Sequence, residues 1–346
     1  MKEINFLRII SKAWNAYDAS RVIKSVTDVS AKVSTNHVFK VDFTNRGPVY
    51  VKLSYYGKFE HFKEDHIIIS NLGNNLEDPY QNFMAKSLVK NNEVFMYKYK
   101  DDCQNAWVIF YNPVQIKKKM PRRLDEKHII KLGVEMAQFH KACDNVRCTL
   151  PSSSKTLLTD VETLEKLIRA GKTFQHQGNE NMVLEQCQQF RENSHACNYA
   201  TFSHLPVFVD WNIGNFSVTS DGRFFSRWDY DWFRVASRVM DFYFMSRVVS
   251  DIGDRTEFSY WAEPMMEDRF IQFLKSYHSI YPLSSDEVVF MKESYRFFIL
   301  NYVIKDGRHF FNEVYANKLQ KEAFETHLPN LDKCFTVDKI LNALKL

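Results

Sequence analysis

The segment Val207-Phe-Val-Asp-Trp-Asn-Ile-Gly-Asn-Phe-Ser-Val218, followed by Arg227-Trp-Asp-Tyr-Asp-Trp232, says most about how this chain folds. Both pieces are rich in aromatic and β-branched residues, and Thr219-Ser-Asp-Gly222 between them has the composition of a turn. We therefore predict a short hairpin. In it, the loop at 210–215 converges with the strand end at 229.

Three side chains with acceptor oxygens occupy this hairpin. Asp210 and Asn215 are five residues apart across the loop, and Asp229 follows fourteen residues after Asn215. An Asp or Asn in a turn is most often a turn former, and each residue alone supports that interpretation. Together they form the set that phosphoryl transfer needs: a carboxylate to orient an attacking hydroxyl, and oxygen ligands for Mg²⁺ beside the phosphates.

The first third of the chain alternates between strand and helix patterns. Proline at 113 ends this part, because it cannot continue a ladder. Helical spacing of apolar residues covers 1–25 and 58–72, and strand patterns cover 37–43, 49–53, 93–97 and 106–111. This order predicts a small antiparallel lobe with a helix at its side. For this lobe, residues 1–112, we expect a five-stranded antiparallel sheet with one helix near 58–72.

Beyond residue 113 the pattern is mainly helical. Helices are expected at 128–142, twice within 155–198, and at 263–279, 285–304 and 333–344, with Ser284 or Ser285 as an N-cap. The fold class is therefore α+β with two lobes. Residues 1–112 form an N-terminal nucleotide-binding lobe. Residues 113–346 form a C-terminal helical lobe that carries the catalytic loop and the substrate site.

The composition is that of an ordinary globular protein, with 45% hydrophobic and 25% charged residues. A net charge of +4 is too small to argue for nucleic acid as a partner. The six cysteines form no C-x-x-C pair, which argues against a zinc or thioredoxin-like site. No apolar run is long enough to span a membrane. We expect a cytoplasmic protein with reduced thiols and no membrane partner; the oligomeric state stays open.

The order Asp-x-x-x-x-Asn, hairpin, Asp-x-Asp resembles the aminoglycoside phosphotransferase and choline/homoserine kinase superfamily, the small-molecule branch of the protein-kinase-like fold. The family's catalytic-loop motif matches at Asp210 and Asn215, and its metal-binding aspartate matches Asp229. The resemblance implies that Asp210 is the catalytic base and that Asn215 and Asp229 hold Mg²⁺. A further family aspartate matches Asp241.

The N-terminal lobe resembles the family in the same order, which implies an ATP site. Lys52 in Val51-Lys52-Leu53 is similar to the phosphate-binding lysine, and Glu64 on the next predicted helix is placed like its partner glutamate. Backbone groups from Tyr111 to Val114 are expected to read the adenine edge. The loop at about 30–38 is expected to cover the phosphates through the hydroxyls and N–H groups of Ser34, Thr35 and Asn36.

The sequence departs from the family at the catalytic loop and at the phosphate loop. Phe208 and Val209 stand where the family has His and Gly, and the loop at 30–38 contains no glycine. Because that histidine mainly braces the loop, we expect altered packing there. We expect His140, on an apolar helix face, to be buried and hydrogen-bonded, and Asp241 to accept backbone N–H bonds that fix the loop.

The favoured function is an ATP-dependent kinase that phosphorylates a hydroxyl of a small molecule. An aminoglycoside, a sugar, an amino alcohol and homoserine all stay open as acceptors. The alternative is a catalytically weak pseudokinase that binds nucleotide or protein, which the missing histidine and glycines favour. A protein kinase is disfavoured, because there is no Asp-Phe-Gly or Ala-Pro-Glu motif and the twelve-residue step from Asp229 to Asp241 leaves no room for a long activation segment.

Overall fold

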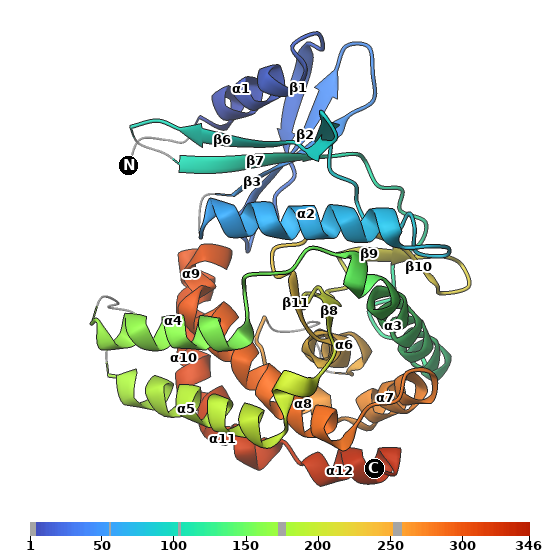
Figure 1. Cartoon of the computed structure of the whole chain (residues 1–346), viewed down its shortest axis with the longest axis vertical. Helices are drawn as coiled ribbons and strands as arrows, with labels where there is room; N and C mark the ends of the chain where they lie inside the picture. The colour runs from blue at the N-terminus through green and yellow to red at the C-terminus, as the bar shows by residue number, and fades with distance from the viewer. Residues whose placement is uncertain (1–4, 55–56, 103–104, 172–177, 252–257) are drawn as a thin grey trace.

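A computed structural model describes residues 5–54, 57–102, 105–171, 178–251 and 258–346. The chain forms a small lobe on a five-stranded antiparallel sheet and a larger, mainly helical lobe (Figure 1). The predicted two-lobed α+β class is confirmed.

The small lobe is built on a sheet with the strand order β1-β2-β3-β7-β6, in which every neighbouring pair is antiparallel. Helix α1 packs on the sheet through the fully buried Trp14, and α2 runs between the sheet and the large lobe (Figure 1). The elements are α1 (Phe6–Asp18), β1 (Ile23–Asp28), β2 (His37–Phe43), β3 (Val49–Ser54), α2 (Phe59–Asn75), β4 (Val89–Lys90), β5 (Glu93–Val94), β6 (Met96–Lys100) and β7 (Asn105–Tyr111).

The expectation of one helical segment over residues 1–25 was wrong at its C-terminal end. Helix α1 stops at Asp18, whose carboxylate accepts the backbone N–H of Ser20 at 3.1 Å. A short polar side chain that bonds the nearby backbone competes with the helical ladder. The chain then turns into β1, the edge strand of the sheet.

The large lobe consists of packed helices around one aromatic-rich core. Helices α3 and α7 approach closely at Gly133, where a Cβ would lie 2.5 Å from the carbonyl oxygen of Phe273, so only glycine fits. The predicted N-cap of α8 is confirmed, since Ser284 and Glu287 form a reciprocal capping box. The helices are α3 (Glu126–Val146), α4 (Leu157–Arg169), α5 (Glu180–Ala196), α6 (Phe242–Val249), α7 (Asp268–Ile280), α8 (Ser285–Phe298), α9 (Gly307–Phe310), α10 (Glu313–Glu322), α11 (Leu328–Cys334) and α12 (Val337–Leu344).

Two short strand pairs interrupt these helices and contain the segment 207–232. Strands β9 (Phe216–Val218) and β10 (Phe224–Arg227) form the predicted hairpin, and β8 (His204–Val207) pairs with β11 (Arg234–Ser237). Gly222 in the hairpin turn has a φ of 81°. Residues 208–215 join β8 to β9 as a loop, which we call the catalytic loop.

Charged side chains tie α4 to the rest of the large lobe. Asp160 of α4 accepts hydrogen bonds from Arg234 at 2.6 Å and from Lys305 at 2.8 Å. Lys305 ends a π-helical segment, Ile299–Lys305, that continues α8. Among the described helices, none is long and apolar enough to cross a membrane.

Candidate active site

The catalytic loop begins with a strained backbone. Val209 has a φ of 60°, a conformation that β-branched residues rarely adopt. Such strain persists only where the surroundings hold it, and here the Oδ1 atom of Asp241 accepts the N–H groups of Phe208 at 2.9 Å and Val209 at 2.6 Å. Glycine adopts such a φ without strain, and the family that the sequence resembles has glycine at this position.

Asp241 is held in turn by His140. The Nε2 atom of His140 lies 3.0 Å from Oδ2 of Asp241, and its Nδ1 atom lies 2.8 Å from the hydroxyl of Tyr277. All three side chains are buried, and burial lowers the pKa of His140. A neutral imidazole therefore donates from Nε2 and accepts at Nδ1. The expectations for Asp241 as a loop brace and for His140 as a buried, hydrogen-bonded histidine are confirmed.

A buried arginine that the sequence did not single out supports the same loop. The guanidinium of Arg227 lies 4.4 Å from the ring centroid of Phe208 and 4.3 Å from that of Trp211, and its Nη2 donates to the carbonyl of Asp210 at 2.8 Å. Both rings are within the distance at which an arginine cation is attracted to an aromatic ring. Phe208, in place of the family's histidine, thus supplies one of these rings. Arg227 sits at an ordinary strand end in the sequence, so no local signal marks it.

Asp210 and Asn215 meet within the loop. The half-buried carboxylate of Asp210 accepts the N–H of Asn212 at 3.0 Å, and the side chain of Asn215 lies beside it. Burial raises the pKa of Asp210 to about 6, and the charge of Asp229 adds to this. The carbonyl of Asn215 accepts the N–H of Trp228 at 3.0 Å, which brings the residue before Asp229 beside the loop. Asp210, Asn215 and Asp229, which the sequence predicts to converge, therefore lie close together.

Lys52 faces this group from the small lobe. Its Nζ atom lies 2.9 Å from Oδ1 of Asp229 and 2.5 Å from Oδ1 of Asp231. Burial would lower the pKa of Lys52, but the two carboxylates raise it above its ordinary value. Burial likewise opposes ionisation of Asp229, yet Lys52 holds its pKa below the usual range, whereas burial raises the pKa of Asp231 to about 6.

The structure differs from the expectation that Glu64 pairs with Lys52. Oε1 of Glu64 accepts the hydroxyl of Ser153 at 2.8 Å and the N–H of Ser154 at 2.7 Å. The N-terminal half of α2 thus faces the segment before α4. That segment is a part of the large lobe that sequence periodicity could not place.

The loop between β1 and β2 also differs from expectation. Thr35 donates its N–H to the carbonyl of Phe310 at 3.2 Å and its hydroxyl to the carbonyl of His309, while Asn36 donates its N–H to the hydroxyl of Ser34 at 3.0 Å. These groups were expected to face phosphates, but in this structure they bind protein. The Nδ2 of Asn36 donates to Oδ2 of Asp231.

The connection between the lobes is joined to α2. The hydroxyl of Tyr111 lies 2.6 Å from Nε2 of His66, whose Nδ1 lies 2.8 Å from the carbonyl of Phe62. Burial lowers the pKa of His66 to about 3, so the ring is neutral and links both partners. Val114 is half-buried against the core of the large lobe. Backbone contacts of Tyr111 and Val114 to adenine stay a prediction.

The donors at the site fit a magnesium ion shared with a nucleotide. Asn215 and Asp229 are hard oxygen donors, which suit Mg²⁺ and not zinc. Asp229 and Asp231 already attract a cationic group, the ammonium of Lys52. Within the described ranges, no group of three or more His, Cys, Asp or Glu side chains forms a metal centre alone. Mg²⁺ commonly takes one or two protein carboxylates and completes its shell with phosphates and water.

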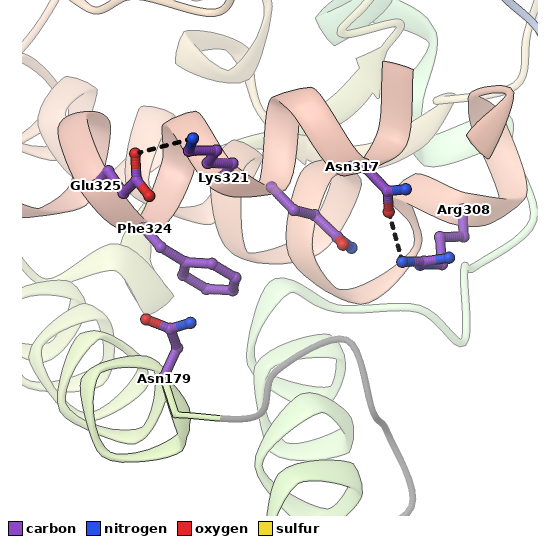
Figure 2. A pocket seen from close by; sticks show the side chains of 7 residues that line it. Asn179, Arg308, Asn317, Lys321, Phe324 and Glu325 are labelled. Atoms are coloured by element: carbon purple, nitrogen blue, oxygen red, sulfur yellow. Dashed lines mark hydrogen bonds and ion pairs between the residues drawn. The ribbon is translucent and has the colours of Figure 1, made fainter. Parts of the chain in front are cut away.

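A separate hollow of about 280 Å³ lies between α5, α9 and α10 (Figure 2). Its polar side chains engage one another: Arg308 donates to Asn317 at 2.6 Å, and Lys321 lies 3.9 Å from Glu325. None of the site residues described above lines it.

No family model matches this sequence, and no curated protein matches it. Solved structures do match over nearly the whole chain. The amicoumacin kinase hAmiN, in complex with AMP-PNP, Ca²⁺ and Ami, has a TM-score of 0.61 at 12% identity, covering 94% of this chain and 95% of that one. Choline kinase LicA from Streptococcus pneumoniae has a TM-score of 0.58 at 12% identity over 95% and 100%. A microcompartment-associated aminopropanol kinase has a TM-score of 0.55 at 13% identity, covering 98% of this chain and 99% of that one. The chain shares the fold of these proteins, as the sequence resemblance predicted.

Proposed function

We propose that this protein is an ATP-dependent phosphotransferase that moves the γ-phosphate to a hydroxyl of a small molecule, with Asp210 as the catalytic base. One observation carries the proposal: Asp210, Asn215 and Asp229 lie close together, with the carbonyl of Asn215 accepting the N–H of Trp228 and Lys52 lying 2.9 Å from Asp229. The shared fold supports it, since neighbours with that fold are named as kinases of amicoumacin, choline and aminopropanol.

Each site residue has its own role in transfer of the γ-phosphate. Lys52 would contact the α- and β-phosphates, and Asn215 and Asp229 would hold Mg²⁺, which would neutralise charge on the phosphates. Asp210 accepts a hydrogen bond from the acceptor hydroxyl and orients its oxygen toward the γ-phosphorus. The new O–P bond forms as the bond to the ADP oxygen breaks, and the hydroxyl proton passes to Asp210. A carboxylate whose pKa is raised to about 6 is a better base than an exposed aspartate.

The second candidate function is a pseudokinase, and two features favour it. Lys52 is engaged by two carboxylates, and the N–H and hydroxyl of Thr35 are engaged by the large lobe. For nucleotide to enter, the contacts of Thr35 and the contact between Lys52 and Asp229 must rearrange.

The test is Asp210→Asn, assayed as ATP consumption against a panel of small hydroxyl compounds. Turnover should fall at least about 10²-fold, since general-base help contributes about 10²–10⁴-fold. The substitution keeps the side-chain shape, so ATP affinity and melting temperature should stay close to those of the parent. The matched control is Asp221→Asn, an exposed aspartate in the turn of the same hairpin.

Three outcomes separate the alternatives. A parent protein that consumes no ATP with any acceptor supports the pseudokinase. Joint loss of stability and ATP binding in Asp210→Asn indicates a turn former. Near-parent turnover in that variant removes Asp210 from the role of base.

A further inference from the structure

Lys52 has two carboxylate partners, and one of them, Asp229, is also the proposed metal ligand. Its Nζ lies 2.9 Å from Asp229 and 2.5 Å from Asp231. The side chain of Asp229 is 40% exposed and that of Asp231 only 21%, so Asp229 is the more open to an incoming ion. If Asp229 turns to a metal, Asp231 is the carboxylate left beside the ammonium.

Helix α2 supplies no substitute. All of α2 lies within the described residues, and none of its carboxylates pairs with Lys52. Glu64 is bound to Ser153 and Ser154, and Asp65 pairs with Lys155 at 2.6 Å. The remaining acid, Glu60, lies in the first turn of the helix.

Asp231 is itself fixed from two sides. Its backbone N–H donates to Oδ1 of Asp229 at 3.3 Å, and its Oδ2 accepts from Nδ2 of the buried Asn36. Asn36 belongs to the β1–β2 loop, which is bound to the large lobe through Thr35 and Phe310. One carboxylate therefore connects the lysine, the metal-ligand segment and the loop expected to cover the phosphates.

We infer that Asp231 is the positioning residue for Lys52, the role that the sequence assigned to Glu64. This inference rests on the proposed function, because positioning matters when Lys52 holds nucleotide phosphates. Asp231 would hold the ammonium of Lys52 in place when Asp229 binds the metal. Through Asn36 it also links Lys52 to the β1–β2 loop, which is bound to the large lobe.

The test compares Asp231→Asn with Asp231→Glu and with the matched control Glu64→Gln. Binding of ATP in the presence of Mg²⁺ is measured by calorimetry. The Kd should rise at least about tenfold in Asp231→Asn, since hydrogen bonds to charged groups contribute roughly 1.5–3 kcal/mol and 1.4 kcal/mol is tenfold. It should stay within about twofold in Glu64→Gln, and Asp231→Glu should recover most of the affinity because the carboxylate is retained.

Opposite results would overturn the inference. If Asp231 has no positioning role, then Asp231→Asn only removes a negative charge beside ATP. ATP binding should then stay unchanged or become tighter. If Glu64→Gln loses more affinity for ATP than Asp231→Asn does, then Glu64 of α2 positions Lys52.

A second measurement needs no nucleotide. Melting temperatures of Lys52→Met, Asp231→Asn and the double variant form a cycle. Because each single change breaks the same pair, the double variant should lose less than the sum of the single losses. The corresponding cycle with Glu64→Gln should be additive. An additive Asp231 cycle refutes the pairing. A non-additive cycle in a protein that binds no ATP instead retains the pairing and refutes the proposed function.

Discussion

The Asp241 brace gives the sharpest test of how the catalytic loop is held. Replacing Asp241 with Ala leaves the buried N–H groups of Phe208 and Val209 without their acceptor. An unsatisfied buried donor costs about 1–3 kcal/mol, so two donors cost about 2–6 kcal/mol in unfolding free energy. The loss should also release the positive φ of Val209 and displace Asp210, which follows it directly. Turnover should therefore fall together with stability.

Asp241→Asn should be milder for a structural reason. The amide oxygen of Asn can still accept both N–H groups. His140 can change tautomer, accepting from the new amide at Nε2 and donating from Nδ1 to the hydroxyl of Tyr277. The cost should be about 1–2 kcal/mol, roughly the difference between charged and neutral acceptors.

Urea unfolding of the parent, both Asp241 variants and the control Asp221→Ala measures these values. Asp221 is an exposed carboxylate of the hairpin turn, and its removal should cost well under 1 kcal/mol, as for most surface changes (about 0.5 kcal/mol). If Asp241→Ala loses less than about 1 kcal/mol, or if Asn costs as much as Ala, the two N–H bonds do not hold the loop and the reasoning fails.

Two further predictions concern pH and metal. Burial alone would raise the pKa of Asp160, but Arg234 and Lys305 lower it to about 2 from 3.8. This depressed pKa contributes about 2 kcal/mol of stability, which is present above pH 4 and is lost as pH falls toward 2. Asp160→Asn should flatten that part of the curve of unfolding free energy against pH. The control Glu162→Gln, on the exposed face of α4, should leave it unchanged. Phosphotransfer should stop after exhaustive chelation and return with Mg²⁺ or Mn²⁺, because Asn215 and Asp229 are hard donors; undiminished transfer in the chelated protein would contradict their assignment.

Several features of the protein follow from its sequence because they depend on neighbours along the chain. Alternation over 37–43 and 49–53, and helical spacing over 58–72, identified elements that the structure shows as β2, β3 and α2. The turn composition at 219–222 located the β9–β10 hairpin. The role of Asp241 was also expected, but only because Asp241 matches an aspartate of the family that the sequence resembles; its 32-residue separation from Val209 gives no local signal.

Tertiary structure alone decided which distant groups meet. Lys52 and Asp229 are 177 residues apart, and Thr35 and His309 are 274 apart. No local pattern distinguishes Glu64 from Asp231 as the partner of Lys52, because both are acids at acceptable positions. The choice depends on where α2 packs, and α2 packs with Glu64 toward Ser153. Arg227 likewise gains its role only when Phe208 and Trp211 fold beside its guanidinium, because cation–π contacts and ion pairs depend on distances in space and not on spacing along the chain.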